Sequence, residues 1–134
     1  MANLAFHHLG LAVQQPQEAL TFLSSLGYSH GDPVFDSLQN IHLIMGTHPS
    51  HPAIEIIFPA SGSGPLDKII RRRLSGIIYH VCYVTENLEQ TLEQWTMAQL
   101  RVVCVSPPKP SVLFWGRKVS FYEVVGMGLI EILE

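Results

Sequence analysis

Ile78-Tyr79-His80-Val81-Cys82-Tyr83-Val84 decides how the chain is interpreted, because its pattern occurs twice. Near the N-terminus, Phe6-His7-His8-Leu9-Gly10-Leu11-Ala12-Val13 has the same outline, a β-rich run with a histidine near its start. A helical pattern follows each run, over residues 16–26 and 87–100. The repeat predicts that a unit of one strand, one helix and further strands is duplicated along the chain.

The repeat continues in two apolar strands that each contain one carboxylate. Glu55 lies in Ala53-Ile54-Glu55-Ile56-Ile57-Phe58, and Glu131 lies in Leu129-Ile130-Glu131-Ile132-Leu133. The two modules therefore contribute one histidine and one glutamate each, in the same order.

Length and composition predict one globular domain over residues 1–134, with a core that needs no disulfides. Charged residues make up only 14% of the chain, which favours an oligomer, and we expect a homodimer. The net charge of −3 gives no indication of nucleic acid or an anionic membrane as a partner. No apolar run approaches the roughly 20 residues of a membrane span.

The N-terminus has no basic segment followed by an apolar one, so we expect no secretion signal. Cys82 and Cys104 fall on separate predicted strands, which indicates no disulfide framework. These features predict a cytoplasmic protein.

The predicted fold class is α+β, with βαβββ modules over about residues 4–60 and 76–134. We expect the helices at 16–26 and 87–100 and a short helix at 66–74. Residues 59–65 are the predicted linker, and residues 106–110 are a predicted proline-rich loop. Strands are expected at residues 6–13, 34–35, 41–46, 53–58, 78–84, 101–105, 119–124 and 129–134.

Alternation along a strand assigns side chains to two faces. In the first strand it places His7 with Leu9, Leu11 and Val13, towards the helix, and His8 on the opposite face. The same argument turns Glu55, His80 and Glu131 away from the helices.

A glutamate among isoleucines needs a partner if it is to stay ionised in an apolar layer. Taken singly, such a glutamate is more often a strand-edge carboxylate, and a strand histidine is more often a hydrogen-bonded core residue. A pseudo-twofold axis between the modules would bring His8, Glu55, His80 and Glu131 to one centre. Imidazole and carboxylate together suit a divalent cation, so we expect a metal site.

These residues resemble the vicinal oxygen chelate superfamily (glyoxalase, bleomycin resistance protein and dioxygenase). The motifs are His8-Leu9-Gly10-Leu11-Ala12-Val13, the Glu55 strand, Tyr79-His80-Val81 and Leu129-Ile130-Glu131. The resemblance implies a curved mixed sheet that forms a half-barrel, with helices on its convex side. The opening and closing strands look most like methylmalonyl-CoA epimerase, and the ligand set is similar to that of bacterial lactoylglutathione lyase.

The resemblance implies a metal-dependent lyase or isomerase that acts on a small carbonyl or thioester compound. One divalent ion (zinc, nickel, cobalt or manganese) would polarise a substrate oxygen, and Glu131 would move the α-proton. In the epimerases a second glutamate precedes the strand of Glu55, and the nearest residue here is His42. Alternation places His42 on the ligand face, where it is the predicted partner of Glu131 in proton transfer.

Two other functions stay open at this point. A dioxygenase would use His8, His80 and Glu131 on iron, although Glu55 would then fill a position that oxygen needs. A metal-free protein that binds an antibiotic is the other alternative. Lys68 and Arg71-Arg72-Arg73 would suit a CoA phosphate or a glutathione carboxylate, but such a run is more often the solvated face of a helix.

Overall fold

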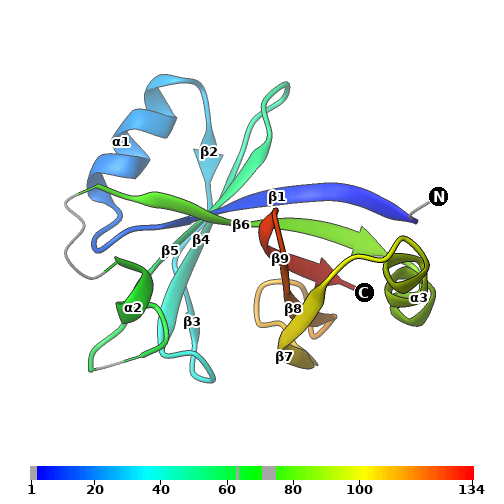
Figure 1. The fold of residues 1–134 in the computed structure, drawn as a ribbon. Helices are drawn as coiled ribbons and strands as arrows, with labels where there is room; N and C mark the ends of the chain where they lie inside the picture. Colours follow the sequence, from blue (N-terminus) through cyan, green and yellow to red (C-terminus); the bar gives the residue numbers. More distant parts are fainter. Residues whose placement is uncertain (1–2, 63, 71–74) are drawn as a thin grey trace. The chain divides into compact units, whose positions relative to one another are not determined.

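A computed structural model describes residues 3–62, 64–70 and 75–134 (Figure 1). The chain divides into two compact units. We call His8–Tyr79 the N-terminal unit, and Met1–His7 together with His80–Glu134 the C-terminal unit. The units differ from the predicted modules at the start of the chain, because residues 4–7 group with the C-terminal unit.

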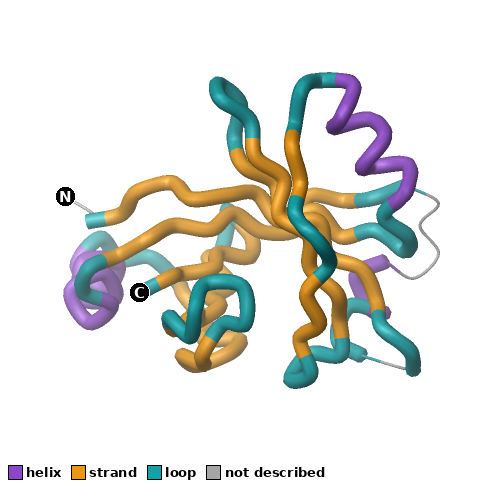
Figure 2. Tube along the Cα trace, turned by 180° about the vertical axis from the view of Figure 1, so that it is seen from behind, coloured by secondary structure: helices purple, strands orange, loops and turns teal. Residues whose placement is uncertain are grey.

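The N-terminal unit is built on a mixed sheet in the order β2-β4-β5-β1, and β3 also pairs with β4. β1 and β5 are parallel, whereas the pairs that β4 makes are antiparallel. Figure 2 shows these strands from behind, with α1 joined to β2 by a short turn. The elements are β1 (Leu4–Ala12), α1 (Gln17–Ser25), β2 (Ser29–His30), β3 (Val34–Asp36), β4 (Ile41–Thr47), β5 (Ala53–Pro59) and α2 (Asp67–Ile70).

The core of the N-terminal unit lies between α1 and one face of this sheet. Leu23 of α1 packs in a buried cluster with Ile44 and Ile56 from the two central strands. The helix ends because Gly27 takes a left-handed conformation, with φ of 95°, that a residue with a side chain rarely adopts. We call this side of the sheet the helix face and the opposite side the ligand face.

The strand order in the C-terminal unit is β1-β6-β9-β8-β7, with parallel and antiparallel pairs. β6 and β9 are parallel, and β8 pairs antiparallel with β9 and β7. Asn87 begins α3 by accepting a hydrogen bond from the Gln90 N–H at 2.9 Å, and Trp95 of α3 packs on Tyr122. The elements after β1 are β6 (Ile77–Thr85), α3 (Leu88–Met97), β7 (Val102–Pro110), β8 (Lys118–Val124) and β9 (Gly128–Leu133).

The predicted α+β class with a mixed sheet is confirmed, but one predicted loop is wrong. Residues 106–110 continue β7 to Pro110 instead of leaving the sheet. The strand tolerates prolines because β7 is at the edge of its sheet, where an N–H group can be dispensed with, and because its register shifts twice. No helix among the described residues is long and apolar enough to cross a membrane.

Candidate functional site

In the N-terminal unit, His8 and Glu55 lie side by side on the ligand face. β1 and β5 are parallel neighbours in which Gly10 is opposite Glu55, so His8 is two residues before that partner position. The His8 Nε2 atom is 3.6 Å from the Glu55 Oε1 atom. His8 is 0% and Glu55 4% exposed, so the pair is removed from bulk water.

In the C-terminal unit, His80 and Glu131 repeat this arrangement. β6 and β9 are parallel neighbours in which Cys82 is opposite Glu131, and His80 again comes two residues earlier. The His80 Nε2 atom is 4.0 Å from the Glu131 Oε2 atom, and both residues are buried. The repeat seen in the sequence is therefore also a repeat of strand register and of side-chain geometry.

Each His–Glu pair has the chemistry of a half-set of metal ligands. Ligand atoms at 2.0–2.2 Å from a tetrahedral cation are roughly 3.4 Å apart, close to the 3.6 Å between His8 and Glu55. A buried carboxylate also needs compensating positive charge, because leaving water costs several kcal/mol. Neutral imidazole with carboxylate is a donor set that suits zinc, nickel or cobalt.

The predicted placement of His42 is wrong. His42 is opposite Phe58 in the β4–β5 pair and shares its face with Ile44, which belongs to the core under α1. Its ring stacks on that of Phe58 at 5.2 Å and contacts Phe35 at 5.4 Å. The residue opposite Glu55 on the ligand face is Met45. His42 therefore lies on the helix face, away from the His8–Glu55 pair.

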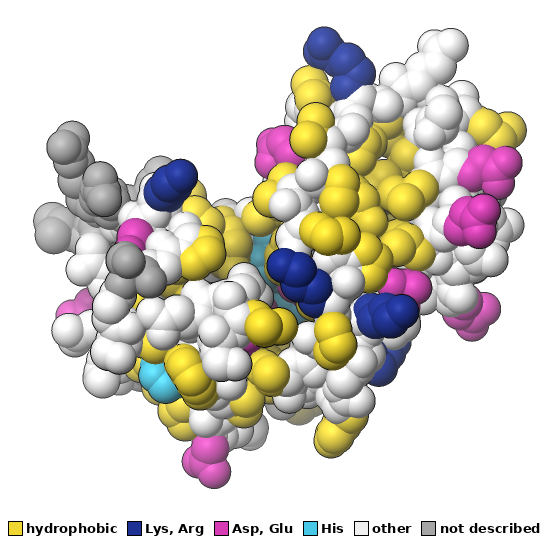
Figure 3. All heavy atoms as spheres, turned by 90° about the horizontal axis from the view of Figure 1, so that it is seen from below, with side chains coloured by type: hydrophobic (Ala, Val, Ile, Leu, Met, Phe, Trp, Pro, Cys, Tyr) yellow, Lys and Arg dark blue, Asp and Glu magenta, His cyan; other side chains and the backbone are white. Residues whose placement is uncertain are grey.

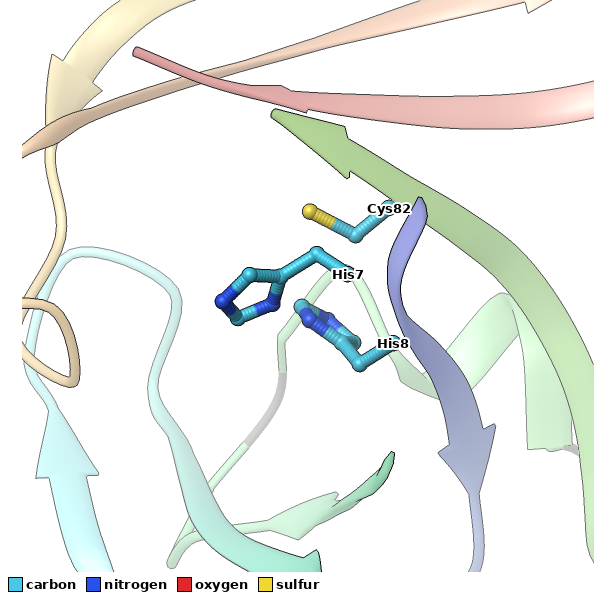
Figure 4. Close-up of side chains that lie close together, drawn as sticks. All are labelled: His7, His8 and Cys82. Atoms are coloured by element: carbon cyan, nitrogen blue, oxygen red, sulfur yellow. The ribbon is translucent and has the colours of Figure 1, made fainter. Parts of the chain in front are cut away.

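His7 also differs from its prediction, because its ring lies beside Phe114 and the Cys82 thiol and not on the helix side. It packs edge-on against Phe114, in the loop between β7 and β8, with 5.1 Å between ring centroids. A ring nitrogen of His7 lies within 4.8 Å of the Cys82 thiol, and Figure 4 shows both side chains.

His7 lies beside Cys82 because the residues of β1 that face the helix differ between the two units. In the C-terminal unit, Leu4 packs in the core under α3 and Phe6 contacts Tyr83 of the same core. Even-numbered residues therefore take the helix face there, and His7 takes the ligand face beside Cys82. In the N-terminal unit the odd-numbered Leu11 packs under α1, so that the even-numbered His8 takes the ligand face.

Phe121 is a further residue of the ligand face in the C-terminal unit. It is opposite Glu131 in the β8–β9 pair, and its ring meets that of His80 edge-on at 5.6 Å. Phe121 was not among the site residues predicted from the sequence. Its register with Glu131 would have been the deciding signal.

Lys68 is exposed on α2, and Arg71-Arg72-Arg73 lie outside the described residues.

Comparison with known structures supports the fold. Methylmalonyl-CoA epimerase from Mycobacterium tuberculosis superposes with a TM-score of 0.79 at 18% identity, over 100% of this chain and 90% of that one. A hypothetical protein from Bacillus halodurans C-125 gives 0.78 at 21% identity, over 98% and 94%. Streptomyces coelicolor methylmalonyl-CoA epimerase in complex with 2-nitronate-propionyl-CoA gives 0.68 at 14% identity, over 96% and 94%. At these identities the likeness shows the fold alone.

Sequence comparison supplies the family. No curated protein sequence matches the chain. The profile of one family does match, over residues 7–121, which span most of the chain and include three of the four predicted ligands. The chain belongs to the glyoxalase/bleomycin resistance protein/dioxygenase superfamily.

Proposed function

We propose that the protein is a metal-dependent lyase or isomerase that moves an α-proton on a small carbonyl or thioester compound. The observation that carries the proposal is the His–Glu pair that each unit holds in the same strand register. A buried pair that occurs once is explained by local hydrogen bonding. The same pair in both halves of a duplicated chain is explained better by a shared ligand.

In this proposal one divalent cation is held by His8, Glu55, His80 and Glu131. The two carboxylates would balance the two positive charges of the ion, and the two neutral imidazoles would complete the set. Zinc, nickel, cobalt and manganese all accept this combination of nitrogen and oxygen donors. The bound ion supplies Lewis acidity towards a carbonyl or thioester oxygen.

The side chains of the C-terminal unit would carry out the proton transfer. Glu131 accepts the proton from the carbon beside the carbonyl group, and its buried position keeps water from that proton. Phe121, opposite Glu131 in the sheet, would hold the carbon skeleton against the carboxylate. The same carboxylate then returns the proton to the neighbouring atom.

A second proton-transfer group on β4, the strand beside Glu55, has little support. The residues of β4 that share a face with Met45 are Ile41, Leu43 and Thr47, and none of them ionises near neutral pH. His42 faces away from Glu55 and is not carried forward as a catalytic residue. Proton movement by one carboxylate, as in isomerisation of a hemithioacetal, is therefore favoured over epimerisation by two bases.

The substrates to test follow from the relatives. One similar structure is described as methylmalonyl-CoA epimerase in complex with methylmalonyl-CoA. CoA thioesters therefore belong in the panel beside hemithioacetals of 2-oxoaldehydes. A homodimer and a cytoplasmic location complete the proposal.

The metal is tested by elemental analysis of protein purified without a chelator, followed by titration calorimetry. We expect one divalent ion per chain, and His8→Ala and His80→Ala should each weaken its affinity at least 100-fold, since one of four ligands is lost. His42→Ala is the matched control and should leave the affinity unchanged. A protein that binds no divalent ion, or that keeps its affinity in both variants, would contradict the proposal.

The reaction is tested by deuterium exchange at the α-carbon in heavy water, read by mass spectrometry on the metal-loaded protein. We expect exchange with a hemithioacetal or a thioester from the panel. Absence of exchange throughout, with metal content verified, would favour an oxygenase or a binding protein instead.

A further inference from the structure

The loop between β7 and β8 is short and closed by its own hydrogen bonds. The Ser111 N–H donates to the Arg117 carbonyl at 2.8 Å, and the Gly116 N–H donates to the Ser111 carbonyl at 3.0 Å. The Leu113 N–H donates to the Ser111 hydroxyl at 3.2 Å. These bonds fix the backbone of residues 109–118, which we call the hairpin tip.

The hairpin tip presents an aromatic ring to water. Trp115 is 95% exposed, and its backbone is left-handed with φ of 52°, a conformation that bulky residues rarely adopt. Its neighbour Phe114 points inward and packs on His7. This arrangement lowers the stability of the protein in two ways, because the ring buries little apolar surface and the backbone is strained. Recognition of a ligand is a physical reason for such an arrangement.

The chain around Trp115 is rich in Lys and Arg, and Glu134 lies against Arg117 and Lys118. Residues 101–122 contain four of the eight Lys and Arg residues of the chain and no Asp or Glu. Lys109, Arg117 and Lys118 of the hairpin tip are all exposed, and Arg117 is oriented by donating from Nε to the Glu134 carbonyl at 2.7 Å. Figure 3 shows basic side chains beside apolar ones on the side of the molecule that is seen from below.

The hairpin tip also reaches the ligand face of its own unit. Phe114 contacts His7, a ring nitrogen of His7 lies within 4.8 Å of the Cys82 thiol, and Cys82 is opposite Glu131 in the sheet. A molecule bound on Trp115 would therefore have its far end near the proposed proton acceptor.

We infer that the hairpin tip binds the nucleotide part of a substrate, with the base stacked on Trp115 and the phosphates on Lys109, Arg117 and Lys118. An indole stacks on any nucleobase, and ammonium and guanidinium groups bind phosphate by charge-assisted hydrogen bonds. A single ring with a few cations suits a small ligand better than a nucleic-acid strand or a membrane surface. The inference rests on the proposed function only in treating the nucleotide as the carrier of the reacting group.

The test is calorimetric titration of the full chain with ADP, in buffer without divalent metal. We expect saturable binding that weakens as salt rises. Trp115→Asn removes the ring but tolerates the left-handed backbone, and should weaken binding about tenfold. Lys109→Gln and Lys118→Gln should each do the same, whereas Lys68→Gln, an exposed lysine of α2, should change nothing.

Tryptophan fluorescence gives a second readout, because the chain has only two tryptophans and Trp95 is 8% exposed. ADP should quench the emission of the Trp95→Phe protein but not that of Trp115→Asn. No binding at millimolar ADP, or equal binding by Trp115→Asn, would overturn the inference. So would pyrophosphate that binds as tightly as ADP, or binding to phosphatidylserine vesicles without binding to ADP.

These outcomes are separate from those of the proposed function. ADP binding is measured without metal and without turnover, so its failure leaves the metal and exchange tests intact. Failure of α-proton exchange leaves the ADP result intact in the same way.

Discussion

The two His–Glu pairs share a backbone plan but not their neighbours. Glu55 has Gly10 and Met45 opposite it on the adjacent strands, whereas the equivalent partners of Glu131 are Cys82 and Phe121. The two pairs therefore have the same strand register, whereas the side chains around them differ. The N-terminal pair lies beside small or apolar groups, and the C-terminal pair lies beside a thiol and an aromatic ring.

This difference suggests a division of roles. A carboxylate flanked by glycine and methionine is suited to holding a cation. The carboxylate flanked by Phe121 has a flat apolar surface beside it that can position a carbon acid. Our assignment of proton transfer to Glu131 depends on this contrast, and four predictions test how far the units are equivalent.

The largest expected effect is on proton exchange. With the metal at saturating concentration, Glu131→Gln should slow α-proton exchange by about 10²–10⁴-fold, since an amide cannot accept the proton. Glu55→Gln should weaken metal affinity but retain exchange to within about tenfold once the metal is bound. Mass spectrometry with metal content verified in each sample measures both rates. Equal losses in the two variants would remove the division of roles.

The second prediction concerns the two cores, which should be equivalent. Ile56 and Ile132 follow Glu55 and Glu131 and are each 0% exposed, in the cores under α1 and α3 respectively. Ile56→Ala and Ile132→Ala should each lower the free energy of unfolding by about 2–5 kcal/mol, measured by urea denaturation. Met97→Ala, an exposed control, should change it by less than about 0.5 kcal/mol. A large difference between the two isoleucines would show that one core dominates.

The third prediction concerns the β4–β5 and β8–β9 hairpin turns, which are stabilised in different ways. In the β4–β5 turn the His48 Nδ1 atom accepts from the Ser50 and His51 N–H groups, at 3.0 and 3.1 Å. Its Nε2–H donates to the Leu26 carbonyl at 3.0 Å, which ties the turn to the end of α1. His48→Ala should lower the free energy of unfolding by about 1–3 kcal/mol, because three backbone groups lose their hydrogen bonds to the imidazole ring.

Thermal unfolding followed by circular dichroism measures this loss. The equivalent β8–β9 turn is shaped by Gly126 and Gly128, both with positive φ. His51→Ala is the control within the first turn and should have the smaller effect. If it matched His48→Ala, ring stacking rather than hydrogen bonding would hold the turn.

The smallest expected effect is on the pH dependence of the free energy of unfolding. Burial raises the pKa of the Tyr122 phenol in the C-terminal unit above its ordinary value of 10.0. The folded state then holds its proton more tightly than the unfolded state, so this contribution to stability is complete below pH 10 and is lost as pH rises above it. Tyr122→Phe should make the decline in unfolding free energy above pH 10 shallower. Identical slopes in urea denaturation at several pH values would contradict this.

His8, Glu55, His80 and Glu131 could be selected from the sequence as candidate ligands because each breaks a pattern. A single glutamate between isoleucines stands out in Glu55 and again in Glu131, and each comes with a histidine at similar spacing. Alternation then gave the right face for all four. No long-range information was needed, because each inference depended on one strand.

The face of His42 could not be predicted in this way, because β4 is apolar on both sides. Leu43 and Ile44 are both buried although they point in opposite directions. A central strand of this kind does not alternate between polar and apolar residues. Its register against β5 therefore decides which face His42 takes. The face of His7 in β1 could not be predicted for a related reason. Alternation assumes that one strand packs against one core, whereas β1 packs against two.

That shared strand has a consequence for how the protein is made. Leu4 and Phe6 are synthesised long before their partners in the C-terminal unit, such as Tyr83 and Ile132. Closing so long a stretch of chain costs entropy and slows folding. The leading segment must therefore wait, exposed and apolar, while the N-terminal unit forms behind it. Apolar side chains exposed in this way during translation are prone to aggregation.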